Sequence, residues 1–128
     1  MNEQELKKLR GLEQKIEQRL YRMHDFEAGE EEIVSLSARL ASVTLFERMR
    51  GGEALEDERF LTAGEAEAYY QYRLYRDTQA ELSGFTAGDI AYEIAGDALE
   101  KARIRRDRAF AQARTLLEDP DGFWFRRI

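Results

Sequence analysis

The sequence predicts an all-α fold, a bundle of about four helices. Three observations predict it: one proline and no cysteine in 128 residues, 36% charged residues mixed with 43% hydrophobic ones, and apolar residues that recur every three or four positions. Few prolines leave helices uninterrupted, and this periodic mixture is typical of amphipathic helices with one buried face. The length fits one domain, which we place at residues 1–119, followed by a C-terminal arm at 120–128.

Apolar spacing and end signals predict the first two helices. The stripe over residues 3–24 consists of Leu6, Leu9, Leu12, Ile16, Leu20 and Met23. The acidic triplet 30–32 suits the positive end of a second helix, which Gly51 and Gly52 should end. The expected buried face of this second helix is Ile33, Leu36, Leu40 and Val43. Residues 53–60 would form one or two short helical turns.

Capping signatures mark the expected starts of two further helices. Thr62 and Glu65 have the spacing of a capping box, so a third helix should begin there and end near Gly84. Asp97 and Glu100 repeat the signature for a fourth long helix, which Pro120 should end.

The segment between these last two helices, residues 85–96, is predicted to be an extended loop or a short strand. Its larger apolar residues alternate with other residues: Ile90, Tyr92 and Ile94 against Ala91, Glu93 and Ala95. This two-residue period is that of a strand. Because a single strand leaves its backbone groups unpaired, it should find an edge elsewhere in this chain or on another chain.

The C-terminal arm ends in an aromatic and basic cluster. Its last six residues are Phe123, Trp124, Phe125, Arg126, Arg127 and Ile128. Exposed aromatic side chains would remain in water unless they dock, and Trp and Arg are frequent anchors of interfaces. We expect the arm to bind a partner; the alternative is that it folds back onto its own bundle.

No pattern in the sequence predicts catalysis or metal binding. His24 is the only histidine, which excludes a Ser-His-Asp triad or a multi-histidine metal site within one chain. The carboxylates lie in polar stretches typical of solvated helix starts, and no glycine-rich phosphate loop is present. We therefore expect neither an enzyme nor a cofactor.

The charge pattern disfavours nucleic acid as the main partner. A net charge of −6 opposes phosphate binding, and the acidic excess lies in residues 1–96, whereas residues 97–128 are mildly basic. The basic block of the fourth helix is Lys101, Arg103, Arg105, Arg106 and Arg108. We interpret it as a row of salt bridges between subunits. The chain has neither a basic leader nor an apolar run near the ~20 residues of a membrane span, so export and membrane insertion are not expected.

Four features follow one another in the second half of the chain. They are a Tyr-rich helix around residues 67–72, a Gly-Phe-Thr-Ala-Gly-Asp stretch at 84–89, a long helix rich in Ala and Arg, and the ending Asp-Gly-Phe-Trp-Phe-Arg-Arg-Ile at 121–128. This order resembles that of the head-completion or head-to-tail adaptor (connector) proteins of tailed bacteriophages and prophages. Residues 1–60 resemble the family only in being helical.

The resemblance implies a helical subunit whose copies form a ring beneath the portal of the DNA-filled head. By this resemblance, the arm residues Phe123 to Ile128 would bind the portal protein. The residues expected to meet neighbouring copies or a tail-side protein are Phe85, Asp89, Ile90, Tyr92 and Ile94. DNA would pass through the ring lumen without sequence-specific binding, since an acidic wall repels it. The protein would be made in the bacterial cytoplasm and reside in the virion at the head-tail junction, away from any membrane.

A second hypothesis is a stand-alone cytosolic helical protein that binds another helix or a small ligand within its bundle. It predicts that the arm and the 85–96 segment pack internally. The adaptor hypothesis predicts instead that neighbouring genes encode portal, capsid and tail proteins.

Overall fold

The computed structural model describes the backbone of residues 1–83 and 88–118, together with side chains in 1–77 and 97–118. Within these ranges the chain is all-α, as predicted. Its elements are α1 (Glu3–Met23), α2 (Glu31–Arg48), the 3-10 helix η1 (Gly52–Glu56), α3 (Glu58–Ser83), α4 (Gly88–Gln112) and the 3-10 helix η2 (Arg114–Leu116). The C-terminal arm 120–128 lies outside the described residues.

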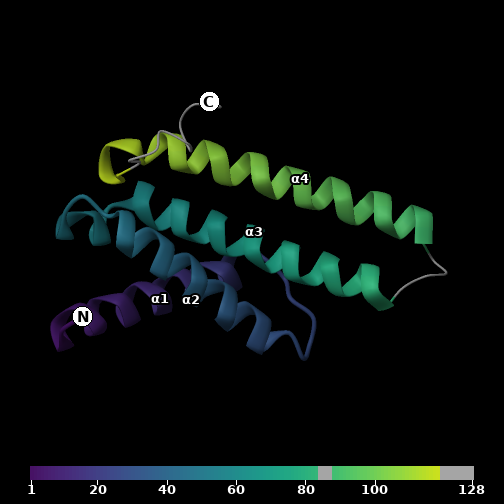
Figure 1. Ribbon diagram of the computed structural model, residues 1–128, viewed down its shortest axis with the longest axis horizontal. Coiled ribbons are helices and arrows are strands. Elements are labelled where there is room, and N and C mark those ends of the chain that lie inside the picture. Colours follow the sequence, from purple (N-terminus) through teal and green to yellow (C-terminus); the bar gives the residue numbers. More distant parts are fainter. Residues whose placement is uncertain (84–87, 119–128) are drawn as a thin grey trace.

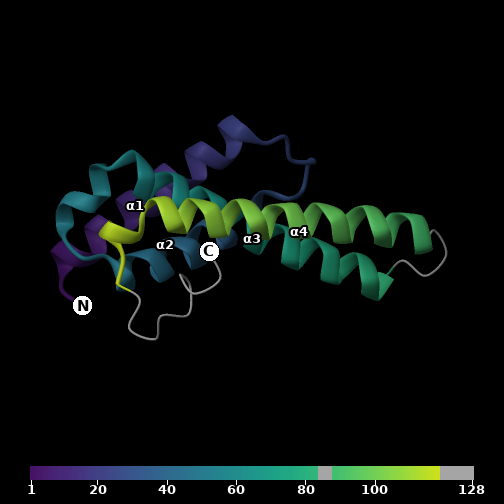
Figure 2. The same ribbon diagram turned by 90° about the horizontal axis from the view of Figure 1, so that it is seen from above.

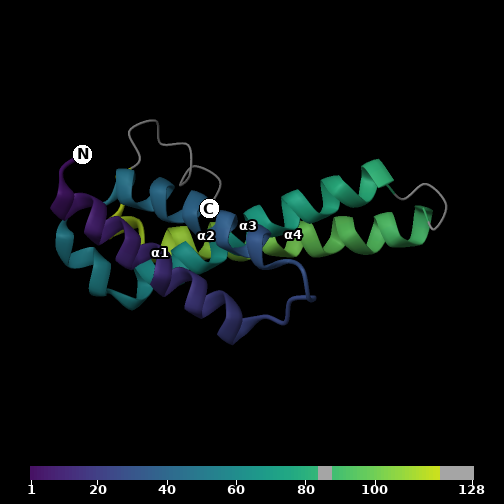
Figure 3. The ribbon, with the colours of Figure 1, turned by 90° about the horizontal axis from the view of Figure 1, so that it is seen from below.

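Helix α3 is the centre of the bundle. Both α1 and α2 pack against it and against each other, whereas α4 runs back along α3 (Figure 1). The views from above and below show that α3 and α4 together extend well past α1 and α2 (Figures 2 and 3). The molecule is therefore an elongated body of four helices with a two-helix extension.

The hydrophobic core lies in the four-helix body. Its larger members are Leu12, Ile16, Leu20, Val34, Leu45, Phe60, Phe110 and Leu117. At Gly64 of α3, a Cβ would stand 2.6 Å from Ile16 Cδ1 and 3.0 Å from Leu45 Cδ1. Glycine therefore allows α1 and α2 to approach α3 at this point.

Of the α2 face predicted to be buried, Ile33 packs partly buried against the core, but the other three residues are exposed. Leu36, Leu40 and Val43 are 44%, 47% and 36% exposed. The buried residues of the helix are Val34, Ser37, Ala38, Ala41, Ser42 and Leu45. Both faces have helical apolar spacing, so periodicity alone cannot choose between them. The smaller side chains lie inward because they allow close packing against α1 and α3.

The predicted start of α3 is wrong by one turn. The helix begins at Glu58, and Asp57 supplies the capping group, because its Oδ1 accepts a hydrogen bond of 2.9 Å from the Arg59 backbone N–H. Thr62 and Glu65 are already inside the helix. The short helical turn expected after α2 is confirmed as η1.

The prediction of an extended segment is wrong for residues 88–96. These residues form the first turns of α4, which begins at Gly88 rather than at Asp97 and ends at Gln112, well before Pro120. The alternation over 90–94 is short, whereas alanines at 91, 95, 98 and 102 continue a helical spacing across it. Alanine has the strongest helix propensity, and this longer pattern prevails.

Candidate interaction surface

The structure gives backbone positions for four of the residues predicted to bind partners. Asp89, Ile90, Tyr92 and Ile94 lie in the first two turns of α4. The others lie outside the described residues: Phe85, Phe123, Trp124, Phe125, Arg126, Arg127 and Ile128.

The four placed residues lie on the two-helix extension, which we call the α3–α4 hairpin (residues 77–83 and 88–96). Arg76 of α3 contacts the segment before α2, since its guanidinium lies 3.5 Å from Glu27 and 3.8 Å from Glu30. Beyond Arg76, α3 continues to Ser83, a distance of about 10 Å. The hairpin is therefore the part of the bundle that α1 and α2 do not cover (Figure 3).

A second exposed feature is an apolar groove between α2 and α3. The groove has a volume of about 310 Å³ and is lined by Ile33, Leu36, Ser37, Leu40, Gln71, Leu74 and Tyr75. We call it the α2–α3 groove. Val43 extends its apolar side by one turn, and Glu31 and Glu32 are exposed at its N-terminal end. Sequence reasoning identified the α2 residues as one face but assigned that face to the core.

The chain leaves the described region beside the C-terminal end of α2. An isolated antiparallel bridge joins Met49 and Leu117. The Arg50 backbone N–H donates to the Leu116 carbonyl at 3.0 Å, and the Glu118 N–H donates to the Arg48 carbonyl at 2.7 Å. Arg50 Nε adds a 2.7 Å bond to the Leu117 carbonyl. This anchor fixes where the C-terminal arm begins, and no local pattern in the sequence predicts it.

A buried carboxylate ties three helices together. Glu65 of α3 is fully buried, and Arg105 of α4 donates to both of its oxygens at 2.6 and 2.7 Å. His24, at the end of α1, places Nε2 at 2.6 Å from Glu65 Oε1 and stacks on Tyr69 with ring centroids 3.8 Å apart. Because a guanidinium and an imidazole already occupy both oxygens, this cluster is a structural tie between helices.

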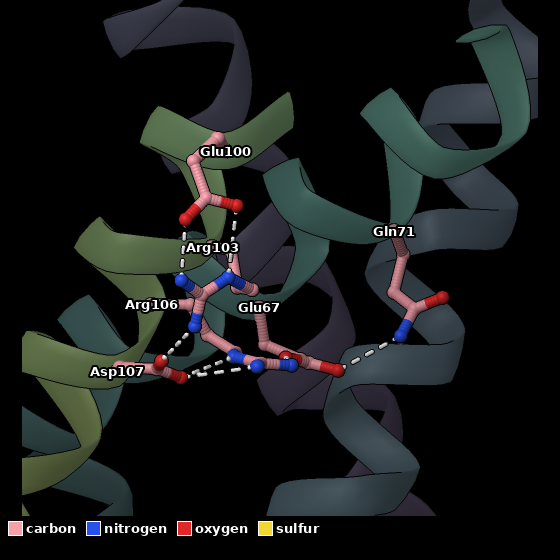
Figure 4. Close-up of polar contacts among 6 residues, drawn as sticks. All are labelled: Glu67, Gln71, Glu100, Arg103, Arg106 and Asp107. Atoms are coloured by element: carbon pink, nitrogen blue, oxygen red, sulfur yellow. Dashed lines mark hydrogen bonds and ion pairs between the residues drawn. The ribbon is translucent and has the colours of Figure 1, made fainter. Parts of the chain in front are cut away.

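The basic block on α4 also forms ion pairs within the chain. Arg103 donates to Glu100 and Asp107, and Arg106 contacts Asp107 and, at 3.4 Å, Glu67 (Figure 4). The Arg106 guanidinium also lies 4.4 Å from the centroid of the Tyr70 ring. Arg103, Arg105 and Arg106 therefore pair with carboxylates of their own chain, and the row of salt bridges between subunits stays a prediction.

Glu67 lies at the inner end of this network. The pKa of its carboxyl is raised, because burial has the largest effect. A 2.9 Å hydrogen bond from Gln71 and the charge of Arg106 oppose this increase only in part (Figure 4). Gln71 of α3 and Arg106 of α4 both bind this carboxylate, so the group serves the packing of α3 against α4.

In the described ranges, no group of three or more His, Cys, Asp or Glu is arranged to hold a metal ion. The helices of this same part of the chain all lack the combined length and apolar character needed to span a bilayer.

Comparisons with protein-family models, with curated proteins and with solved structures find no match to this chain. Inference of its function therefore depends on the arrangement of its own residues. Two features of that arrangement bear on function: the α3–α4 hairpin and the α2–α3 groove.

Proposed function

We propose that this chain is a structural adaptor of a phage head-tail connector. Its copies would form a ring beneath the portal and link the portal to the tail while DNA passes through the lumen. The observation that carries the proposal is the α3–α4 hairpin, which extends past the body of the molecule and holds the residues expected to meet neighbouring subunits. The resemblance of the second half of the chain to connector proteins points to the same assembly.

Helix geometry is the reason to expect that another chain contacts the hairpin. Ile90 and Ile94 are one turn apart and share a side of α4, whereas Tyr92 is rotated from both by about 200°. Among the described residues, α3 runs beside this part of α4, and a single helix covers a single side of its neighbour. Apolar and aromatic residue types thus occupy positions on two sides of α4, which favours contact with another chain.

The acidic character of the chain fits a subunit that DNA passes without binding. The net charge is −6, and the arginines 103, 105 and 106 are engaged by carboxylates of the same chain. Cations paired in this way offer little to phosphates. In this proposal, the arm 120–128 attaches the subunit to the portal, and the hairpin meets a neighbouring copy or a tail-side protein.

Deletion of residues 120–128 tests the attachment. We expect the truncated chain to keep its far-ultraviolet circular dichroism, because the described core ends at Leu117, and to lose co-purification with the portal protein of the same phage. Unchanged co-purification would refute the role of the arm. A loss of helical signal would show instead that the arm belongs to the core.

Substitution on the hairpin tests the contact between subunits. Tyr92→Asp should abolish incorporation into particles, whereas Glu93→Gln, at the next position, should leave it unchanged. Electron microscopy of purified particles should show the protein as a ring between portal and tail. Absence of the protein from purified wild-type particles would refute the adaptor proposal.

The α2–α3 groove favours one other function, that of a stand-alone module that binds a helix of another protein. Its exposed leucines and Tyr75 match what an amphipathic helix requires of a groove. Portal, capsid and tail genes beside this gene would favour the adaptor; their absence would favour the module.

A further inference from the structure

Three large apolar side chains of α2 face solvent in the described part of the molecule. Leu36, Leu40 and Val43 are spaced by four and three residues, so they form one continuous stripe along the helix. The stripe borders the α2–α3 groove, where Leu74 and Tyr75 add further apolar surface. A contiguous surface of this kind is usually covered by a partner segment.

The described chain ends beside the C-terminal end of the helix that carries this stripe. In the bridge just after α2, Leu116 pairs with Arg50 and Glu118 pairs with Arg48, so residues 116–118 run antiparallel to residues 48–50. From Leu116 to Glu118 the chain therefore advances toward Arg48, the last residue of α2. Residue 119 follows directly from this position.

The arm is long enough to cover the whole stripe. Val43 lies about 7.5 Å before Arg48 along the helix axis, and Leu36 lies about 18 Å before it. Residues 119–128 can span up to about 33 Å when extended. The four residues 119–122 reach about 13 Å, which is enough to bring Phe123 to Leu40.

The order of side chains in the arm matches the order of groups along α2. The aromatic residues 123–125 come first, where Val43 and Leu40 lie. Arg126 and Arg127 come next, toward the N-terminal end of the helix. Exposed Glu31 and Glu32 lie at that end, about one turn beyond Leu36. Laid along α2 in this direction, the arm would bring apolar residues to apolar residues and cations to carboxylates.

We propose that in the free chain the arm residues Phe123 to Ile128 dock on the α2–α3 groove of the same molecule. The short connection from Glu118 keeps the arm near its own groove at a millimolar effective concentration, which a second copy does not reach in dilute solution. A partner that binds the arm uncovers the groove. The inference does not rest on the proposed adaptor function, because docking is a property of the isolated chain.

Trp124 is the only tryptophan and therefore reports on the arm alone. In the full chain we expect its fluorescence to be blue-shifted and shielded from acrylamide. Leu40→Asp, at a position that is 47% exposed in α2, should raise the quenching constant several-fold without loss of helical signal. Leu6→Asp, at a similarly exposed position of α1, should leave it unchanged. Quenching of the wild-type chain as fast as that of a free peptide with the sequence of residues 119–128 would overturn the proposal.

Because the chain has no native cysteine, engineered disulfides can test whether the arm of the same chain occupies the α2–α3 groove. The double variant Leu40→Cys/Phe125→Cys should form a disulfide within the monomer on mild oxidation, and Leu6→Cys/Phe125→Cys should not. Crosslinked dimers in place of monomers, or protection of Trp124 that falls on dilution, would assign the groove to a second copy and refute docking on the same chain. Portal attachment is measured separately, by co-purification with the portal protein, so either proposal can fail while the other stands.

Discussion

At the scale of single residues, Gly64 sets how closely three helices approach. A methyl group at this position would press on the buried side chains of Ile16 and Leu45, whereas a Cβ at Gly11 of α1 meets nothing within 4 Å. Both glycines lie inside helices, where replacement by alanine gains about 1 kcal/mol in helix propensity. Comparing alanine substitutions at the two sites therefore separates the effect of helix propensity on stability from the effect of packing.

We predict opposite outcomes for the same substitution at these two glycines. Gly11→Ala should raise the free energy of unfolding by about 0.5–1 kcal/mol. Gly64→Ala should lower it by about 1 kcal/mol, because overpacking costs about 1–3 kcal/mol and exceeds the gain in propensity. Urea unfolding measures both. Equal stabilisation by the two variants would show that Ile16 and Leu45 move aside at little cost.

Tyr72 is the residue whose ionisation the fold changes most clearly. It is buried, and its hydroxyl donates to both oxygens of Glu30 at 2.8 and 2.9 Å. Burial and, next, this hydrogen bond raise the pKa of Tyr72 to about 12. An unfolded tyrosine loses its proton near pH 10. The stabilisation linked to Tyr72 is therefore fully present below about pH 10 and is lost as the pH rises through about 12.

Tyr72→Phe should lower the free energy of unfolding by about 1.5–3 kcal/mol at neutral pH, since it removes the donor to a carboxylate. The exposed Tyr75 provides the control, and Tyr75→Phe should change stability by less than about 0.5 kcal/mol. Titration of tyrosinate absorbance should show one transition near pH 12 that the Tyr72→Phe variant lacks. A transition near pH 10 for Tyr72 would contradict the hydrogen bond.

At the scale of elements, the Glu65 carboxylate joins the end of α1 to α3 and α4. Removing it would leave Arg105 without its partner in a half-buried position. Breaking a buried pair costs about 3–5 kcal/mol, and the partial exposure of Arg105 reduces the effect, so we expect Glu65→Ala to cost about 2–3 kcal/mol.

Glu56 offers a matched comparison, because it also pairs with a cation from α1 but is mostly exposed. Glu56→Ala should change the free energy of unfolding by less than about 1 kcal/mol. Denaturant unfolding of Glu56→Ala and Glu65→Ala measures both effects. Adding Arg105→Ala and the double variant Glu65→Ala/Arg105→Ala gives the coupling energy between Glu65 and Arg105. A coupling near zero would mean that Glu65 is held by packing alone.

At the scale of the whole molecule, the body and the α3–α4 hairpin have separate structural roles. Arg76 of α3 contacts Glu27 in the segment before α2, and the described core lies in the body. We predict that replacing residues 79–92 by a short Gly/Ser turn preserves a cooperative unfolding transition with a similar midpoint. Circular dichroism would detect a loss of helix limited to the removed residues. Collapse of the transition would show that the hairpin is needed for the core.

The sequence predicted the helical class and the positions of α1 and α2, because long apolar periodicity and acidic helix starts act locally. It failed where two local patterns competed. Alternation over residues 90–94 favoured a strand, but the alanines at 91, 95, 98 and 102 extend a helical period through the same segment. The cap of α3 at Asp57 was missed because Thr62 and Glu65 offered a stronger signature one turn later.

The sequence by itself determined that the chain is helical, acidic and rich in apolar residues at its C-terminal end. Only the tertiary structure decided which face of α2 is buried, because both faces have helical spacing and the choice depends on side-chain size against α1 and α3. It also decided that Arg105 binds Glu65 and that Arg106 contacts Glu67, since these partners are about 40 residues away in sequence. Such pairings depend on how helices meet in space, which no local pattern encodes.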